Sequence, residues 1–256
     1  MADSAQSAIL IEDRGVVRWI TINRPQAANA IDDAVARGLI DGLREAASTP
    51  GIRAVVLTGA GPRVFSAGVD LRGRTGLSDD EIAESRRLRT HGSIDAVVGF
   101  EKPLVSALNG VTSGAGCMIA LLTDYIVAAE HASLVLPEID VGMPCFLGLE
   151  IVKRLAGEAL AIDLVQSGRR LAPAEAVQHG LIRATVPAAD LVAAAQSAAE
   201  MLAAKPALPF ALNKRWLATG RREAIARAAE ESHRVRPLLL ADPETRTPHA
   251  ARFQKS

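Results

Sequence analysis

Short apolar, β-branched runs alternate with helix-like segments over the first two thirds of the chain. The pattern predicts strands at residues 16–22, 55–58, 104–108, 125–128 and 133–136. It predicts helices at residues 32–47, at 79–100 and directly after the glycines at 114 and 116. In the first of these helices, apolar residues recur on one face and Asp32 occupies the N-cap position. Repeated strand and helix units of this kind indicate an α/β core.

The character of the sequence changes after about residue 147, where alanine-rich helical segments dominate. Helices are predicted at 147–155, 157–166, 173–178, 188–203, 206–219 and 221–234, and a further strand at 181–186. Because no linker rich in proline or serine separates the two parts, we expect a core over residues 1–195 and a helical C-terminal subdomain over residues 196–256 that does not fold independently. The segment after Asp242 has weak periodicity and is interpreted as a loose tail or a packing arm.

Composition and charge exclude several classes of protein. Aromatic residues make up 3% of a chain that is 49% hydrophobic, so the core must consist mostly of alanine, valine, leucine and isoleucine. The 29 basic and 29 acidic residues balance, which argues against a general binder of nucleic acid or of an anionic membrane. The basic run at residues 86–89 is interpreted as a solvated helix face or a local phosphate contact.

The chain shows no stretch of 18 apolar residues and no leader pattern at its start, so we expect a cytoplasmic protein without a membrane span. Two cysteines do not make a disulfide framework, and the five histidines show no metal-ligand spacing. No metal or cofactor is therefore expected.

Two turns rich in glycine follow predicted strands. The first is Ala67-Gly68-Val69-Asp70, and the second is Gly114-Ala115-Gly116, which opens an apolar helix. Glycine allows close approach of a backbone to a ligand, and the free N–H groups of a turn or a helix N-terminus favour an anion. A plain loop in the first case and close helix packing in the second are the alternatives.

A carboxylate, Glu138, follows Pro137 at the end of the predicted strand 133–136. At the end of a strand that faces a cleft, it would be a natural general base. The alternative is a surface glutamate that caps a loop, and Asp140 competes for the same role. Cys117 and Cys145 are interpreted as small buried apolar residues.

Taken together, these segments resemble the crotonase superfamily, the enoyl-CoA hydratase/isomerase family. Four blocks carry the resemblance, in the family's order and spacing, over about residues 8–220. They are Ile20-Thr21-Ile22-Asn23-Arg24-Pro25 through Asn29-Ala30, Ala54 through Leu71, Lys102-Pro103 through Asp124, and Pro137-Glu138 with Gly142.

The resemblance implies an α/β fold, a spiral of ββα units with a helical C-terminal trimerisation region, assembled as a homotrimer or as a hexamer of two trimers. It implies an acyl-CoA thioester as substrate, with coenzyme A as part of that substrate. The backbone N–H groups of Val69 and Ala115 would form an oxyanion hole, and losing one such donor typically lowers the rate by about 10²–10³. Backbone atoms around Ala27, Ala67, Gly68, Leu71 and Gly114 would hold the substrate, and Asp70 would fix the turn.

The sequence departs from the family in two places that matter for function. The basic residue expected after the N-terminal Arg-Pro is Gln26, so Arg24 or Arg72 is expected to contact a CoA phosphate instead. Typical hydratases of the family have two glutamates, but Met118 stands at the position of the first and only Glu138 remains.

One base suffices for a Δ3,Δ2-enoyl-CoA isomerase, so the leading prediction is an isomerase of the crotonase type. The alternatives are an enoyl-CoA hydratase, another crotonase reaction such as acyl-CoA hydrolysis or decarboxylation, and an acyl-CoA-binding protein without activity.

Overall fold

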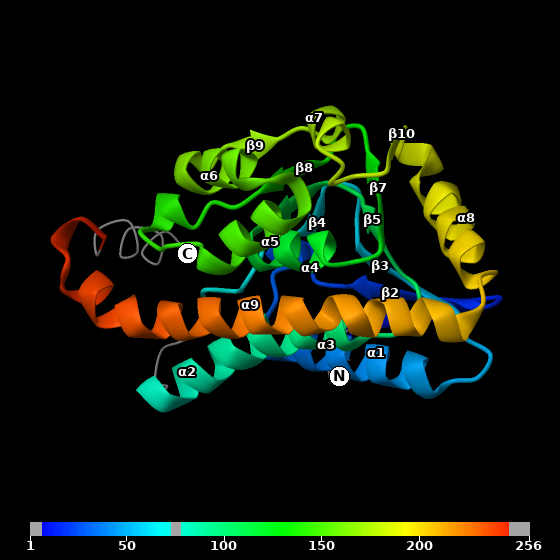
Figure 1. Ribbon diagram of the computed structural model, residues 1–256, viewed down its shortest axis with the longest axis horizontal. Helices are drawn as coiled ribbons and strands as arrows, with labels where there is room; N and C mark the ends of the chain where they lie inside the picture. Colours follow the sequence, from blue (N-terminus) through cyan, green and yellow to red (C-terminus); the bar gives the residue numbers. More distant parts are fainter. Residues whose placement is uncertain (1–6, 73–77, 246–256) are drawn as a thin grey trace, which may run out of the picture.

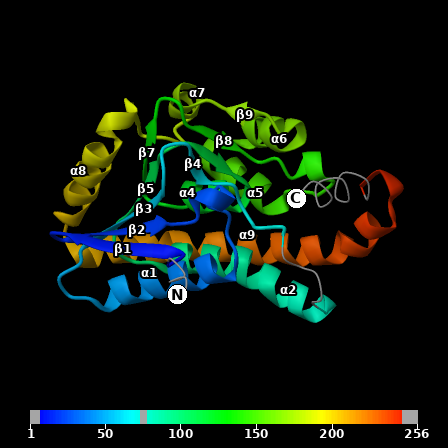
Figure 2. The same ribbon diagram turned by 180° about the vertical axis from the view of Figure 1, so that it is seen from behind.

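The computed structural model describes residues 7–72 and 78–245 and contains two sheets. The strands of the larger sheet lie in the order β1 (Ile9–Arg14), β2 (Val17–Ile22), β3 (Ala54–Gly59), β5 (Leu104–Leu108), β7 (Tyr125–Ala129) and β10 (Ala184–Val186). Strand β1 is antiparallel to β2, and the other neighbours are parallel. Figure 2 shows β1 and β2 at one edge of the molecule.

The smaller sheet has the order β4 (Val64–Ser66), β6 (Val111–Ser113), β8 (Ser133–Val135) and β9 (Arg170–Leu171). Strands β3 and β4 follow each other along the chain but belong to different sheets, and so do β5 and β6, and β7 and β8. A helical segment follows each of these pairs. The chain therefore winds as a spiral of ββα units, which is the organisation expected from the sequence.

Helices surround the sheets (Figure 1). The α-helices are α1 (Asp33–Ser48), α2 (Asp79–Arg87), α3 (Ser93–Gly99), α4 (Gly114–Leu121), α5 (Phe146–Ala156), α6 (Glu158–Ser167), α7 (Pro173–Gln178), α8 (Leu191–Ala203) and α9 (Ala207–Ala241). The shorter helical segments are η1 (Pro25–Ala27), η2 (Leu88–Gly92), η3 (Ile139–Val141) and η4 (Ala188–Asp190).

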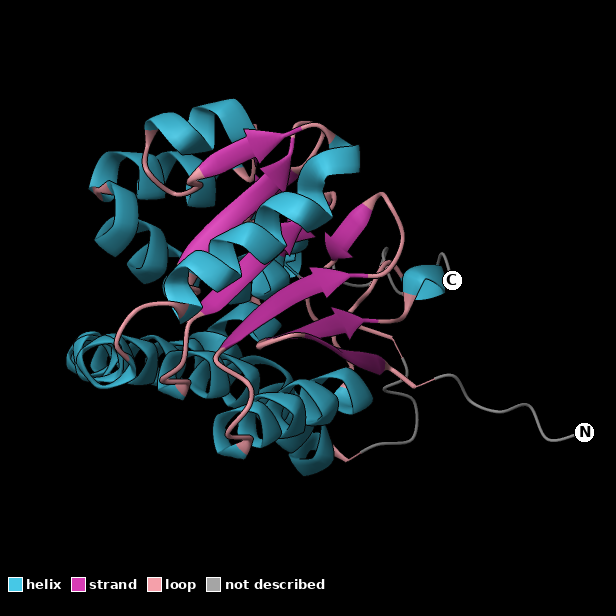
Figure 3. Cartoon of the chain, turned by 90° about the vertical axis from the view of Figure 1, so that its right-hand side faces the viewer, coloured by secondary structure: helices cyan, strands magenta, loops and turns pink. Residues whose placement is uncertain are grey.

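The central strands β2, β3, β5 and β7 of the larger sheet are buried on both faces, which explains why they are almost continuously apolar. Successive side chains of β3 point to opposite faces: Val55 and Leu57 join the main core, whereas Ala54 and Val56 pack in a second cluster with residues of α8. Figure 3 shows α8 lying across the strands on that second face. The predicted boundary between residues 195 and 196 falls inside α8.

Most predicted elements are confirmed. Helix α1 begins where expected, and the Asp32 carboxylate accepts a hydrogen bond from the Val35 N–H at 2.9 Å. The helix predicted at 79–100 is present as α2, η2 and α3, with a π-helical turn at its centre. Strand β1, which lies at an edge and is largely exposed, is not predicted by the apolar pattern.

The two helices predicted at 206–219 and 221–234 are wrong as separate elements, because α9 runs without a break through Gly220 to Ala241. A glycine inside a helix costs about 1 kcal/mol relative to alanine. Packing on α5 outweighs this cost, since Ala224 and Ile225 are buried there, and Gly220 itself lies close to Arg154 of α5.

None of the described helices is long and apolar enough to cross a membrane. Beyond α9, the backbone of Thr245 lies against Gly142, where a Cβ atom would be 2.8 Å from the Thr245 oxygen. The rest of the predicted tail, residues 246–256, lies outside the described residues, as do residues 1–6, on which the expectation of no leader depends.

Candidate active site

A cavity of about 270 Å³ lies where the two glycine turns meet. Its walls come from the segment after β4, the start of α4, the segment from Pro137 to Leu147, the α2–η2 region and the C-terminal half of α9. These segments are far apart in the sequence. Figure 1 shows α2 and the C-terminal half of α9 on the same side of the molecule.

The first turn is held by a short parallel bridge to Ile31. The Ile31 N–H donates to the Gly68 carbonyl at 2.8 Å, and the Asp70 N–H donates to the Ile31 carbonyl at 2.9 Å. In a parallel bridge, the residue between these two bonds directs its own N–H away from the partner strand. The N–H of Val69 therefore points away from Ile31, and Val69 lines the cavity.

The two turns pack closely because glycines stand at the contact. Gly68 has a φ of +90°, which favours glycine, and a Cβ there would lie 3.0 Å from the Ser113 carbonyl oxygen and 3.4 Å from the Ala115 nitrogen. A Cβ on Gly116 would lie 2.6 Å from the Ser66 Cβ. The sequence leaves close helix packing as the alternative to a backbone ligand site at the second turn. Here the glycines pack closely and the same turn also lines the cavity, so the two interpretations are compatible.

Helix α4 begins at Gly114, so Ala115 belongs to its first turn. The N–H groups of a first turn have no acceptor within the helix, and they lie at the positive end of the helix dipole. Ala115 also lines the cavity. The N–H groups of Val69 and Ala115 are therefore two backbone donors, on adjacent turns, that are suited to a developing negative oxygen.

The carboxyl group of Glu138 reaches the same cavity from the segment after β8. Its Oε1 would be 3.2 Å from a Cβ on Gly114, and its Oε2 is buried without a hydrogen-bond partner among the described residues. Burial raises the pKa of Glu138, although the Cys145 thiol beside it acts in the opposite direction. Asp140, the competing carboxylate, is exposed and lies against Gly168 instead.

Both cysteines are buried and neither is in a disulfide. Burial raises the pKa of each thiol above its ordinary value, and the Glu138 carboxylate raises the pKa further. They therefore remain thiols at neutral pH and are poor nucleophiles. Cys145 lines the cavity, whereas Cys117 faces the apolar interior behind α4.

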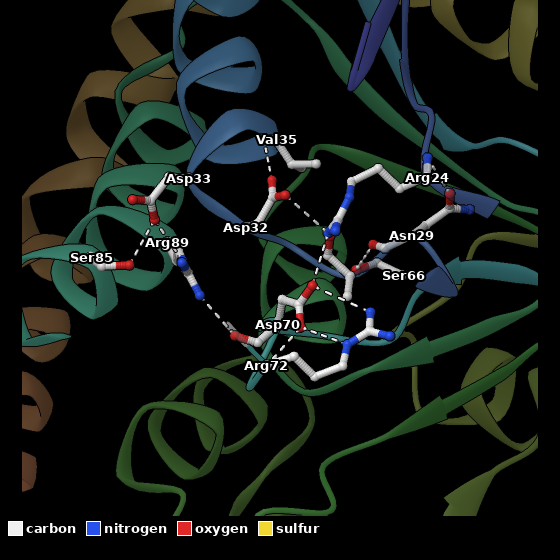
Figure 4. A network of polar contacts seen from close by, with 11 residues as sticks. Arg24, Asn29, Asp32, Asp33, Val35, Ser66, Asp70, Arg72, Ser85 and Arg89 are labelled. Atoms are coloured by element: carbon white, nitrogen blue, oxygen red, sulfur yellow. Dashed lines mark hydrogen bonds and ion pairs between the residues drawn. The ribbon is translucent and has the colours of Figure 1, made fainter. Parts of the chain in front are cut away.

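The carboxylate of Asp70 faces away from the cavity into a network of arginines (Figure 4). Arg24 Nη1 lies 3.1 Å from Asp70 Oδ2 and also donates to the Ala30 carbonyl at 2.8 Å. Arg72 donates to Asp70 through its backbone N–H at 3.0 Å and through its side chain at 3.1 Å. These contacts lower the pKa of Asp70 against the opposing effect of burial, which is the largest single influence.

A third arginine, Arg89 of η2, connects the first turn to the helices beside the cavity. Its Nη1 donates to the Asp70 carbonyl at 2.8 Å, and its Nε donates to Asp33 at 2.6 Å (Figure 4). Ser85 also donates to Asp33, at 2.7 Å. The next two residues of η2, Thr90 and His91, line the cavity.

The structure brings together most of the residues that the sequence singles out. The cavity is lined by Ala67, Gly68, Val69, Leu71, Gly114, Ala115, Met118 and Glu138. Arg24, Ala27 and Asp70 do not line it, and Arg24 and Asp70 act in the network that holds the first turn. The cavity also contains Arg86, His91, Cys145, Ser232 and Arg236, which come from distant helices and loops and which no sequence motif marks as neighbours.

A larger groove of about 710 Å³ lies between the end of α1 and the junction of α8 and α9. One of its cations, the half-buried Lys102, donates to the carbonyls of Ala46, Thr49 and Ile52 at 2.7–2.9 Å. Those bonds occupy the ammonium group, so this groove offers less chemistry than the smaller cavity.

The sequence pattern of the enoyl-CoA hydratase/isomerase family matches residues 12–237. The chain belongs to this family. It is 34% identical over 225 residues to a probable enoyl-CoA hydratase of Rhizobium meliloti, an alignment that covers 87% of this chain and 82% of the relative. It is 31% identical over 250 residues to the 2,3-dehydroadipyl-CoA hydratase of Escherichia coli, covering 97% and 96% of the two chains.

Solved structures confirm the fold. A carnitinyl-CoA hydratase from Mycobacterium avium superimposes with a TM-score of 0.83 at 29% identity, covering 98% of this chain and 97% of the other. EchA1_1 from Mycobacterium paratuberculosis superimposes with a TM-score of 0.82 at 31% identity, covering 96% of each chain. The crotonase-like α/β fold and an enzyme of the crotonase type, both expected from the resemblance, are thereby confirmed.

Proposed function

We propose that this enzyme is a Δ3,Δ2-enoyl-CoA isomerase that uses Glu138 as its single base. The observation that carries the proposal is the composition of the cavity wall. Glu138 is the one carboxylate among the described residues that line the cavity, and Met118, a thioether that cannot transfer a proton, is buried in the same wall. A hydratase that adds water with two carboxylates would therefore lack one of those carboxylates in this cavity.

The proposed reaction needs two proton transfers at one carboxyl group and two backbone donors for the thioester oxygen. The Glu138 carboxylate takes a proton from C2 of a 3-enoyl thioester, and the electrons move onto the thioester oxygen to give a dienolate. The N–H groups of Val69 and Ala115 stabilise that oxygen. The Glu138 carboxylic acid then returns the proton at C4, which leaves the 2-enoyl thioester without any added cofactor. A raised pKa assists the first step, since a carboxylate of higher pKa is a stronger base toward the C2 proton.

Hydration is the second candidate, because curated relatives such as those of Rhizobium meliloti and Escherichia coli carry the name hydratase. Both candidate reactions form an enolate in the oxyanion hole. Hydration also needs a second group that transfers a proton, and Met118 cannot be that group.

Substitutions at the two positions test the proposed base, and the products of the wild type separate the two candidates. We expect Glu138→Gln to abolish conversion of 3-enoyl-CoA to 2-enoyl-CoA, and Met118→Ala to retain most of it, both measured on proteins with unchanged circular dichroism. Full isomerase activity in Glu138→Gln would refute the proposed base. Turnover of crotonyl-CoA to 3-hydroxybutyryl-CoA by the wild type at typical hydratase rates would favour hydration. Tight acyl-CoA binding without exchange of the C2 proton in deuterated water would indicate a binding protein.

We also infer that copies of the chain associate through the C-terminal helical region, as a trimer or a dimer of trimers, in the cytoplasm. Large apolar side chains of α9 support association: Leu208, Leu212, Trp216 and Leu217 are exposed, with Trp216 at 83%. Sedimentation velocity on the full chain measures the oligomeric state, and a monomer at micromolar concentration would contradict this inference.

A further inference from the structure

The largely apolar cavity wall carries two arginines in addition to the proposed reacting groups. Arg86 of α2 and Arg236 of α9 line it from two separate helices. His91 of η2 and Ser232 of α9 add polar groups to the same wall. Burial and the nearby charge of Arg87 lower the pKa of His91, so the imidazole is neutral and can donate one hydrogen bond. Glu138 contributes the one negative charge among the described lining residues.

Arg236 differs from its neighbour on the same helix. Arg234 is 67% exposed at its side chain and forms an ion pair with Glu231. Arg236 is partly buried, lines the cavity and has no hydrogen-bond or ion-pair partner within residues 7–72 and 78–245. Two neighbouring arginines of α2 differ in the same way. Arg87 is 71% exposed at its side chain and pairs with Glu84, whereas Arg86 lines the cavity.

An apolar acyl chain would be a poor occupant of this wall. It would displace water from the Arg236 guanidinium without offering an acceptor, and a charge desolvated without a partner is strongly unfavourable. A carboxylate offers two acceptor oxygens that match the fork of an arginine, and such charge-assisted pairs are among the strongest hydrogen bonds in proteins.

We propose that the cavity selects acyl-CoA substrates whose acyl chain ends in a carboxylate, with Arg236 as the main recognition residue and Arg86 beside it. The reacting end of the acyl group lies at Glu138, Val69 and Ala115, and the free carboxylate lies against α2 and α9. This inference rests on the proposed binding of an acyl-CoA in the cavity, and it holds for either an isomerase or a hydratase.

A phosphate of coenzyme A is the other anion that these arginines could meet, and the two sources predict different results. A contact with the terminal carboxylate affects only acyl chains that carry one. A contact with a CoA phosphate affects every acyl-CoA alike.

The test compares two saturated thioesters of equal chain length, adipyl-CoA and hexanoyl-CoA. Dissociation constants are measured by titration calorimetry for the wild type, for Arg236→Met and for the matched control Arg234→Met. We expect the wild type and the control to bind adipyl-CoA more tightly than hexanoyl-CoA by about 10- to 100-fold, the range for a hydrogen bond to a charged group. Arg236→Met should lose this preference and leave hexanoyl-CoA binding within about threefold.

Two results would overturn the inference: equal affinity of the wild type for both thioesters, or an equal loss for both in Arg236→Met, which would indicate a phosphate contact. The pair Arg86→Met and Arg87→Met repeats the comparison on α2. The binding measurement does not depend on turnover, so it tests this inference separately from the proposed reaction. If the proposed reaction fails but the inference holds, the wild type will show no exchange of the C2 proton and will still bind the two thioesters with different affinities.

Discussion

At the scale of single residues, Glu138 shows how a fold sets up a base. Its carboxyl group is buried beside Gly114, has one oxygen without a partner among the described residues and has a raised pKa. A glutamate in this setting is unfavourable for stability once it is ionised. The same burial makes the carboxylate a stronger base toward the C2 proton, so stability and activity depend on this side chain in opposite ways.

The raised pKa of Glu138 gives a signed prediction for stability. A carboxyl whose pKa is raised by folding stabilises the fold fully below its ordinary pKa of 4.5, and this contribution is lost as the pH rises through the folded pKa. We therefore expect Glu138→Gln to be inactive yet more stable than the wild type at pH 8, with a smaller difference at pH 4.5. Urea unfolding at the two pH values measures this, and an advantage that shrinks as the pH rises would contradict it.

At the scale of elements, the first turn, which carries the proposed oxyanion donor Val69, is held by side chains of helices outside it. Arg89 spans from Asp33, at the start of α1, to the Asp70 carbonyl in the first turn. The π-helical turn η2 places Arg89 on this side while Thr90 and His91 face the cavity. Interruptions of this kind inside helices occur often at functional sites.

Removing the Arg89 contacts should loosen the turn that carries Val69. We expect Arg89→Met to lower kcat by about 10-fold or more with a smaller change in KM, since a misplaced donor stabilises the transition state less. The matched control is Arg87→Met, because Arg87 is exposed and, among the described residues, its ion pair is with Glu84 of its own helix. Steady-state kinetics on both proteins checks this, and equal kcat values for Arg89→Met and the control would exclude a positioning role.

At the scale of the whole molecule, α9 connects the helical C-terminal part to the α/β core. Lys214 of α9 donates to Asp124 at 2.7 Å and to the Lys102 carbonyl at 3.0 Å, and Asp124 also accepts from the Leu104 N–H at 2.8 Å. Both ionic side chains are largely buried, at 10% and 17% exposure. Further along, α9 supplies Ser232 and Arg236 to the cavity, so one helix connects the core and the site.

Breaking this buried ion pair should destabilise the entire chain. Lys214→Met leaves Asp124 without its cation, and we expect the free energy of unfolding to fall by about 3 kcal/mol. Arg215→Met is the matched control, since Arg215 pairs with Glu101 on the surface and such pairs contribute about 1 kcal/mol or less. Urea unfolding of both variants compares them. A loss below about 1 kcal/mol for Lys214→Met would show that this buried pair contributes no more than a surface pair.

The sequence alone determined much of the local structure and predicts the reacting groups. The strands around Val55 and Val105, the Asp32 cap and both glycine turns follow from periodicity and local backbone preference, which act over a few residues. Four blocks in order identified the family, and with it Val69, Ala115 and Glu138.

Tertiary structure decided which distant residues share the cavity. Nothing near Arg236 in the sequence indicates that it lies beside Arg86, since 150 positions separate them and helix periodicity does not specify which helices meet. The continuity of α9 through Gly220 was likewise decided by packing on α5, which outweighs a local preference of about 1 kcal/mol. Local physics thus fixes many of the elements and the two glycine turns, whereas the wall proposed to select the acyl group exists only once the helices pack together.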